Sequence, residues 1–246
     1  MSYREFPPAK DLAAIVDCTW ERVGSAEDAA RVLVLPDGRA DLIWRRGELR
    51  LAGPDSEAFA SPVAPAEQVT GIRFRPGWAG AVLGWRMADL RGLRVPIADV
   101  WGTEAARLSE DLALAAGAAE RRLLLEAEVR RRLASVRLPD EVVPAAVRRL
   151  GLPGSRVGAL GDELGISERQ LRRRFDDAVG YGPKLLDRIL RFQRFVERAD
   201  GAADGLEDLA RLAAEVGYAD QAHLSRDSVR LSGLPPAALA RSRKAA

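Results

Sequence analysis

The segment SERQLRRRFDDAVGYGP, residues 167–183, has a counterpart later in the chain, DQAHLSRDSVRLSGLPP at residues 220–236. The residues in front of each segment repeat as well, because VGALGDELG at 157–165 matches LARLAAEVG at 209–217. The second copy has one extra residue between these two parts. The C-terminal third of the chain therefore contains an internal repeat, and the repeat decides how the rest is interpreted.

Each copy has the pattern of a helix, a tight turn at glycine and a second helix. In the second helix of the first copy, Leu171, Phe175 and Val179 recur every four residues and predict one buried stripe. Ser167 stands where a helix N-cap is expected, and Asp220 stands at the matching position of the second copy. This is the helix-turn-helix plan, in which the second helix enters the major groove of DNA.

Basic and polar residues lie mostly off that stripe and extend along the same helix: Arg169, Gln170, Arg172, Arg173 and Arg174. The planar guanidinium of arginine matches a guanine edge or a phosphate. A solvated basic helix face is the alternative interpretation of such a cluster. The repeated helix-turn-helix pattern around it favours DNA binding.

Composition limits the other classes of function. The 246 residues are 47% hydrophobic and 30% charged, with a formal net charge of +2, as in an ordinary soluble globular protein. Cys18 and His223 are the only residues of their kinds, so a Cys/His zinc site and an intrachain disulfide are excluded. No long apolar run or secretory signal appears, so we expect a cytoplasmic protein without a membrane partner. No nucleotide-binding or nucleophile-elbow motif occurs, and neither a cofactor nor catalysis is expected.

The chain changes character along its length, which predicts an α+β fold of two domains. A β-rich domain with helices is expected at 1–134, a linker with a leading helix at 135–155, and an all-α domain at 156–246. Predicted strands are AIVDCTW, RVLVLP, ADLIWR, ELRLAG and QVTGIRFRP, and PDGR at 36–39 is predicted to join two of them as a hairpin turn. Predicted helices are 78–85, 103–116, 119–136, 140–150, 156–164, 167–179, 183–198, 206–216, 220–231 and 235–242.

The residues from about 155 to 243 resemble the DNA-binding domain of AraC/XylS-type bacterial transcription regulators. The runs LGISERQLRRRF and VGYGP of the first copy carry the resemblance, together with VGYADQAHLSRD and LSGLPPAAL of the second. The resemblance implies two helix-turn-helix motifs joined by a long helix, here about 183–198. It also implies that the two recognition helices enter successive major grooves of double-stranded DNA.

Carried over by position, the resemblance implies contacts to base edges from both recognition helices. In the first helix these are Arg169, Arg172 and Arg173, and in the second they are Gln221, Ala222, Ser225 and Arg226. Ala222 offers only an apolar contact, for example to a thymine methyl group. Four further residues complete the predicted DNA-binding set: Ser167, Gln170, Arg174 and His223, the last expected beside a phosphate.

The second copy departs from the family pattern at Ser228, where an aromatic residue is usual, as Phe175 is in the first copy. Three interpretations are open. Val229 turns inward by a small rotation of the helix, Tyr218 fills the space, or the second motif is looser and contributes less to binding.

The N-terminal residues, in particular LPDGRADLIW and TGIRFRPGWAGAVLG, are similar to a domain found in front of this DNA-binding module in other regulators. In the wider family that domain is often a small, cupin-like β-barrel that binds an effector or forms a dimer. We therefore expect a small-molecule effector, with candidate binding residues Trp20, Trp44, Arg73, Arg75, Trp78 and Trp85. The alternative is that the tryptophans are core residues and the arginines lie on the surface.

Together these features predict a sequence-specific transcription regulator that responds to an effector. A second copy of the chain, through the helix at 119–134, and RNA polymerase are further candidate partners. The alternative hypothesis is a regulatory protein that binds a partner and has weakened DNA binding of its own.

Overall fold

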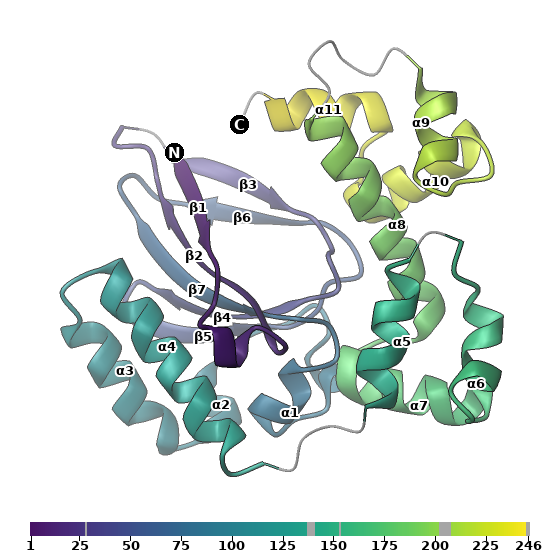
Figure 1. The fold of residues 1–246 in the computed structure, drawn as a ribbon. Coiled ribbons are helices and arrows are strands. Elements are labelled where there is room, and N and C mark those ends of the chain that lie inside the picture. The colour runs from purple at the N-terminus through teal and green to yellow at the C-terminus, as the bar shows by residue number, and fades with distance from the viewer. Residues whose placement is uncertain (28, 137–140, 153, 202–207, 245–246) are drawn as a thin grey trace.

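The computed structural model describes residues 1–246 apart from residues 28, 137–140, 153, 202–207 and 245–246. A β-rich N-terminal part packs beside a C-terminal part made of helices (Figure 1). The predicted α+β fold with two parts is therefore confirmed. Helix α4 ends at Leu133, next to the predicted domain boundary, and most of the predicted linker's first residues lie outside the described ones. The exact division into domains stays a prediction.

The strands form two antiparallel sheets. The larger sheet contains, in spatial order, β1 (Ser2–Phe6), β2 (Val16–Val23), β7 (Gln68–Phe74), β4 (Ala40–Arg45), β5 (Glu48–Ala52) and β8 (Arg94–Pro96). The smaller sheet pairs β3 (Ala30–Val34) with β6 (Phe59–Val63) and lies across from the larger one (Figure 1). The five predicted strands are present, while β1, β6 and β8 were not predicted. Among the described residues the two sheets share no strand pairing, so they do not close into one continuous barrel.

The predicted hairpin at PDGR, residues 36–39, is wrong. The strands on either side of this segment belong to different sheets, because β3 pairs with β6 whereas β4 pairs with β5 and β7. Leu33 and Leu35 pack against the core of the C-terminal helices, and the carbonyl of Pro36 accepts a hydrogen bond from Gln193 Nε2 at 2.6 Å. This segment is fixed by contacts with the C-terminal part and not by strand pairing.

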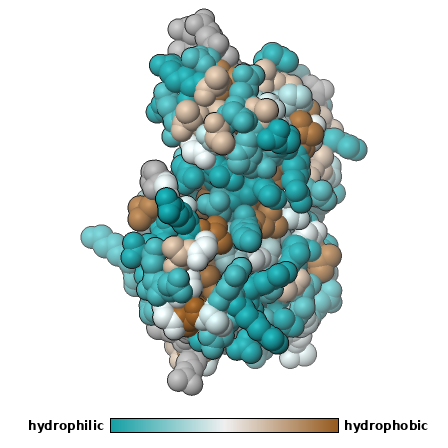
Figure 2. Space-filling view, turned by 90° about the vertical axis from the view of Figure 1, so that its right-hand side faces the viewer, coloured by the Kyte–Doolittle hydropathy of each residue, from teal (hydrophilic) through white to brown (hydrophobic). Residues whose placement is uncertain are grey.

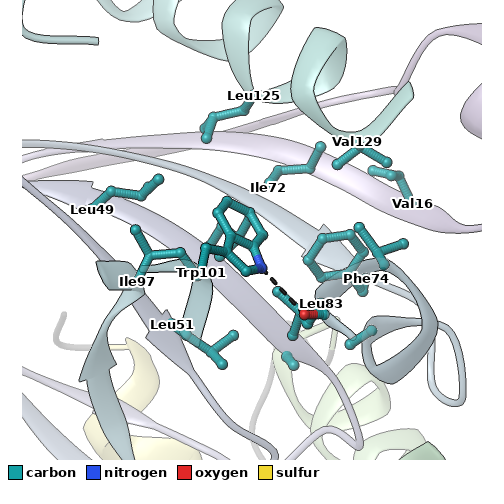
Figure 3. Close-up of a cluster of buried hydrophobic side chains, with 14 of the residues drawn as sticks. Val16, Leu49, Leu51, Ile72, Phe74, Leu83, Ile97, Trp101, Leu125 and Val129 are labelled. Carbon is teal, nitrogen blue, oxygen red and sulfur yellow. Dashed lines mark hydrogen bonds between the residues drawn. The ribbon is translucent and has the colours of Figure 1, made fainter. Parts of the chain in front are cut away.

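Side chains on one face of the larger sheet form the core of the N-terminal part. These positions alternate along the strands, and they include Leu42 and Trp44 on β4 and Ile72 and Phe74 on β7. In Figure 3 Ile72 and Phe74 lie beneath α4, and the indole of Trp101 donates a hydrogen bond to the carbonyl of Leu83 at 3.2 Å. The helices and turns around this core are η1 (Lys10–Leu12), α1 (Ala79–Leu83), η2 (Met87–Leu90), α2 (Ile97–Trp101), α3 (Glu104–Leu114) and α4 (Ala118–Leu133).

The C-terminal part consists of α5 (Val142–Leu150), η3 (Val157–Ala159), α6 (Leu160–Glu163), α7 (Glu168–Val179), α8 (Pro183–Asp200), α9 (Leu209–Glu215), α10 (Gln221–Ser232) and α11 (Pro236–Lys244). Helices α6 and α7 form one helix-turn-helix motif, and α9 and α10 form the other, with α8 between them (Figure 1). Helix α8 buries Leu186, Ile189, Phe192 and Phe195 in one shared core. The predicted pair of motifs joined by a long helix is confirmed.

The first helix-turn-helix motif packs directly against the N-terminal part. Arg86 Nε lies 2.7 Å from Asp177 Oδ1 at the end of α7, and Arg91 Nε donates to the carbonyl of Gly180 at 2.6 Å. Gly180 has a φ of +93°, and a Cβ there would lie 2.7 Å from Pro54 and 2.9 Å from the Met87 carbonyl. Glycine thus serves both the turn and the close approach of the two parts.

Replacing Gly180 with alanine should destabilise the protein more than the same change at Gly233, the equivalent turn of the second motif. Both glycines have positive φ, which costs an alanine about 1–2 kcal/mol. Only Gly180 also has close neighbours, so Gly180→Ala adds overpacking of about 1–3 kcal/mol, whereas nothing lies within 4 Å of a Cβ at Gly233. Urea unfolding followed by circular dichroism measures both variants. Equal losses of stability would show that the contact between the two parts contributes nothing.

Candidate DNA interface and ligand pocket

Helix α7 begins with a capping box. The Ser167 side chain accepts a hydrogen bond from the Gln170 backbone N–H at 3.3 Å, and Gln170 Oε1 accepts one from the Ser167 backbone N–H at 3.0 Å. Two residues of the predicted DNA-binding set thus fix the start of the recognition helix. Both side chains are exposed. Their contact with DNA stays a prediction.

Three arginines of α7 share one exposed face of the helix, off the buried stripe. Leu171, Phe175 and Val179 are buried as predicted, whereas Arg169, Arg172 and Arg173 are exposed at positions i, i+3 and i+4 of one helix face. Arg174 is only partly exposed and makes an interaction of its own within the protein. The structure therefore brings the three predicted base-edge candidates of α7 onto a single surface.

Helix α10 presents a less charged surface at the equivalent positions. Asp220 caps the helix by accepting a hydrogen bond from the His223 backbone N–H at 2.6 Å. Gln221, Ala222 and Arg226 are exposed, and Ser225 is partly exposed. Figure 2 views the molecule from the side where the C-terminal helices lie, and this face is largely hydrophilic with small apolar patches.

The side chain of His223 is only partly exposed and contacts other side chains of the protein. Its ring contacts the edge of Tyr218, with ring centroids 5.0 Å apart, and its Nε2 lies 3.7 Å from Asp227 Oδ2. The same carboxylate lies 3.2 Å from Arg188 Nε on α8. The side chain of His223 thus lies beside the Asp227–Arg188 ion pair that joins α10 to α8, a position that its predicted place beside a phosphate did not include.

Ser228 replaces an aromatic anchor with hydrogen bonds. Its side chain is fully buried, and its Oγ donates to the carbonyl of Leu234 at 2.7 Å. Ser232 Oγ donates to the carbonyl of Ser228 at 2.7 Å and accepts from the Leu234 backbone N–H at 3.2 Å. Val229 is 48% exposed, so the hypothesis that it turns inward is wrong. The two serines tie the end of α10 to the turn that precedes α11.

A pocket of about 290 Å³ lies between the two sheets, on the face of the larger sheet opposite the core. The strand register arranges the residues on this face of the sheet in rows across β2, β7 and β4. Arg22, Val69 and Arg45 form the first row, Trp20, Gly71 and Ile43 form the second, and Cys18, Arg73 and Asp41 form the third. The small sheet adds Val34, Phe59 and Val63 from the other side.

Trp20 forms part of the floor of this pocket. A Cβ at Gly71 would lie 2.4 Å from the indole ring, so the ring rests directly on the backbone of β7 because that position is glycine. The indole N–H donates to Asp41 Oδ1 at 2.9 Å. These contacts fix the plane of the ring against the sheet.

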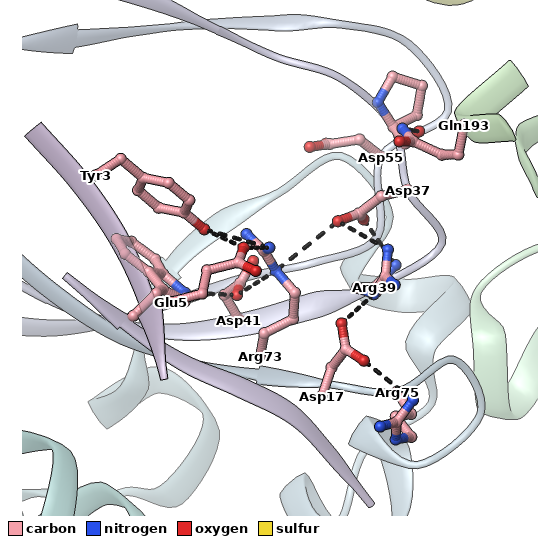
Figure 4. Close-up of polar contacts among 12 residues, drawn as sticks. Tyr3, Glu5, Asp17, Asp37, Arg39, Asp41, Asp55, Arg73, Arg75 and Gln193 are labelled. Atoms are coloured by element: carbon pink, nitrogen blue, oxygen red, sulfur yellow. Dashed lines mark hydrogen bonds and ion pairs between the residues drawn. The ribbon is translucent and has the colours of Figure 1, made fainter. Parts of the chain in front are cut away.

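Arg73 lines the pocket, but protein carboxylates already surround it. Its guanidinium lies 3.1 Å from Asp41, 3.0 Å from Glu5 and 3.8 Å from Asp37 (Figure 4). A guanidinium that faces into a pocket needs a negatively charged partner. At Arg73 the protein supplies that partner itself.

The other predicted effector residues lie apart from the pocket. Trp44 and Trp78 are buried in the core beneath the sheet. Trp85 is 43% exposed and donates to the carbonyl of Val100 at 3.2 Å. Arg75 follows β7 and bonds to Asp17 at 3.0 Å and to the carbonyl of Ala13 at 2.9 Å. Of the six predicted residues, the pocket contains Trp20 and Arg73.

Several lining residues were missed by sequence analysis: Arg22, Arg39, Asp41, Arg45, Arg50, Asp55, Phe59 and Arg94. A signal for some of them was present. In ADLIWR the polar and charged residues alternate with Leu42 and Trp44, which places Asp41 and Arg45 on the face away from the core.

Two family models match separate parts of the chain. Residues 160–242 match the family model described as "Helix-turn-helix domain", and residues 4–96 match "Domain of unknown function (DUF6597)". Residues 160–242 form an AraC-type helix-turn-helix domain. The chain is thus a DNA-binding transcription regulator.

Among solved structures, the chain is similar to ToxT from Vibrio cholerae. One ToxT structure is 12% identical with a TM-score of 0.46, and the match covers 98% of each chain. A ToxT structure bound to an unsaturated fatty acid is 10% identical with a TM-score of 0.42, covering 90% of this chain and 93% of ToxT. No curated protein matches the chain.

None of the helices in the described part of the chain is long and apolar enough to span a membrane. Within the same ranges, no group of three or more His, Cys, Asp or Glu side chains is placed to hold a metal ion.

Substituting phenylalanine for Ser228, as the family pattern would suggest, should destabilise the second motif. The site is fully buried and its hydroxyl is bonded to Leu234, so a larger side chain overpacks it by about 1–3 kcal/mol and breaks that bond. Ser228→Ala removes only the hydroxyl and should cost about 0.5–1.5 kcal/mol. Thermal unfolding ranks the variants, and a higher melting temperature for Ser228→Phe would reveal an unfilled cavity.

Proposed function

We propose that this regulator reads two successive major grooves with α7 and α10 and senses a small molecule in the pocket between its two sheets. The observation that carries the DNA part is the pair of recognition helices fixed on α8. Helix α8 has 18 residues, about 27 Å of helix, and its buried stripe is shared by both motifs. Successive major grooves on one face of DNA are about 34 Å apart, so a rigid helix of this length suits the spacing.

The two recognition helices contribute unequally to DNA binding. Helix α7 carries Arg169, Arg172 and Arg173 on its exposed face and is suited to guanine edges and phosphates. Helix α10 exposes Ala222 and Val229 on the same side as Arg226 and Arg230, so it offers apolar contacts to thymine methyl groups beside two arginines. We therefore assign most of the charge-based affinity to the first motif.

The pocket is connected to the DNA-binding part through the segment at residues 36–38. Asp37 lines the pocket and lies within ion-pair distance of Arg73 and Arg39, and Figure 4 follows these contacts toward Gln193 on α8. On either side of Asp37, the Pro36 carbonyl accepts from Gln193, and a Cβ at Gly38 would lie 2.7 Å from Leu186. A ligand that moves Asp37 would therefore act directly on the helix that spaces the two motifs.

The alternative hypothesis, a partner-binding protein with weakened DNA binding, rested on Ser228. The buried and hydrogen-bonded serine removes the reason to expect a loose second motif. Catalysis also lacks support in the geometry. Burial raises the pKa of the Cys18 thiol to about 12, so it stays protonated at neutral pH and is a poor nucleophile. His223 points to Asp227 and Tyr218 and not to a nucleophile.

Dimerisation, a contact with RNA polymerase and a cytoplasmic location remain parts of the proposal. Most of the apolar residues of α4 pack on the sheet of their own chain: Val129 is buried, and Leu124 and Leu133 are partly buried against the same core. Leu123 is 65% exposed and is the residue of this stripe available to a second copy. A dimer through α4 would therefore be limited to its outer face.

Alanine at Arg173 should weaken binding to DNA sites selected from a random library by about 1–3 kcal/mol, a loss of roughly 5- to 150-fold. Fluorescence anisotropy at several salt concentrations measures both the affinity and its salt slope. Arg107→Ala, at an exposed arginine of α3, is the matched control and should bind like the wild type. Unchanged affinity and slope for Arg173→Ala would remove Arg173 as a base-reading residue, and equal binding to selected and random DNA would favour the partner-binding alternative.

A further inference from the structure

The arginines that line the pocket are matched with carboxylates, with one exception. The matched pairs are Arg39 with Asp17, Arg45 with Glu67, Arg50 with Glu48, Arg73 with Asp41, and Arg94 with Asp55. Arg22 also lines the pocket, and among the described residues no carboxylate lies within ion-pair distance of it. Within the described part of the chain, the pocket therefore contains one guanidinium whose charge is not matched by a carboxylate.

The surroundings of Arg22 make that charge costly. Its guanidinium carbon lies 5.2 Å from the ring centroid of Tyr3 and 5.7 Å from that of Trp20. Its Nε is buried without a hydrogen-bond partner, and burial lowers its pKa below the ordinary value for arginine. Two aromatic faces stabilise a cation only in part, so the site favours an incoming anion.

The carboxylate that pairs with Arg45, the arginine in the same row as Arg22, is already engaged. Glu67 accepts from Arg45 Nε at 2.7 Å, from Arg46 Nε at 2.8 Å and from the Ala64 backbone N–H at 2.8 Å. These contacts, first of all the bond from Arg45, lower the pKa of Glu67 to about 2. Glu67 thus stays ionised and held by these groups, and it leaves Arg22 to a ligand.

Apolar surface continues from Arg22 along the pocket. Val69 faces Arg22 across the β2–β7 pair, and the indole of Trp20 covers Gly71 in the next row. Phe59 of the small sheet faces this region beneath the guanidinium of Arg94, 4.2 Å from its ring centroid. The cavity volume of 290 Å³ corresponds to roughly ten water-sized groups. The Trp20 ring offers a flat apolar surface to a ligand body of about that size.

We infer that the pocket binds a small organic monocarboxylate, with its carboxylate on Arg22 and a flat apolar body lying over Trp20 toward Phe59. One unmatched guanidinium calls for one negative charge, and a carboxylate meets the planar guanidinium with two parallel hydrogen bonds. A dianionic phosphate or phosphonate would bring a second charge without a partner. The inference rests on the proposed sensor role of the pocket, and it places the head group two rows away from Asp41 and the segment that touches α8.

The test uses the full chain and three probes of one shape: cinnamate, the neutral cinnamamide and the dianionic styrylphosphonate at pH 8. Isothermal titration calorimetry should show cinnamate binding about tenfold or more tightly than the amide, because one charged hydrogen-bonded pair is added. The phosphonate should bind more weakly than cinnamate. Arg22→Gln should abolish the preference for cinnamate over the amide without lowering the melting temperature of the ligand-free protein, since it removes an unmatched charge.

Arg50→Gln is the control, because Arg50 also lines the pocket but bonds to Glu48 and to the Arg94 carbonyl. This variant should keep the preference for cinnamate. Equal binding of cinnamate and the amide, tighter binding of the phosphonate, no binding of any probe, or an unchanged preference in Arg22→Gln would each overturn the inference. Cinnamate binding that leaves DNA affinity unchanged would instead uphold the ligand class and count against the sensor role.

Discussion

The antiparallel register of β2, β7 and β4 determines which side chains meet in the N-terminal part. Successive residues of a strand face opposite sides of the sheet, so a shift of one residue would exchange the two faces. In the observed register Leu42 and Ile72 enter the core beneath α4, while Arg22, Trp20 and Arg73 enter the pocket. The hydrophobic core thus selects the register, and the register in turn assembles a charged pocket from residues far apart in the chain.

The two motifs of the C-terminal part anchor their recognition helices by different chemistry. Phe175 anchors α7 by burying an aromatic ring. At the equivalent position of α10, Ser228 anchors the helix end by a hydrogen bond to Leu234, and Ser232 completes the arrangement. A buried hydroxyl that has its partner is compatible with a well-packed core, whereas an unpaired one would cost about 1–3 kcal/mol. The repeat therefore preserves the helix geometry without preserving the residue.

The sequence was sufficient for features that depend on local pattern. The apolar period of α7, the caps at Ser167 and Asp220 and the paired motifs are all local, and each was predicted. Strand pairing depends on contacts between distant segments, which is why the segment at 36–39 was taken for a hairpin although α8 holds it. The residues that line the pocket could not be predicted for the same reason. Residue type alone selected the tryptophans, but only the register separates Trp20 in the pocket from Trp44 in the core.

The position of the segment at 36–39 bears on how a signal would pass between the two parts. Asp37 belongs to the pocket, while its neighbours Pro36 and Gly38 contact Gln193 and Leu186 of α8. Because α8 shares its buried stripe with both motifs, a displacement at this one segment would reach α7 and α10 together. A tightly packed helix moves as a unit and does not deform gradually. The geometry therefore favours a change in how the two recognition helices are presented to DNA over a change within either helix.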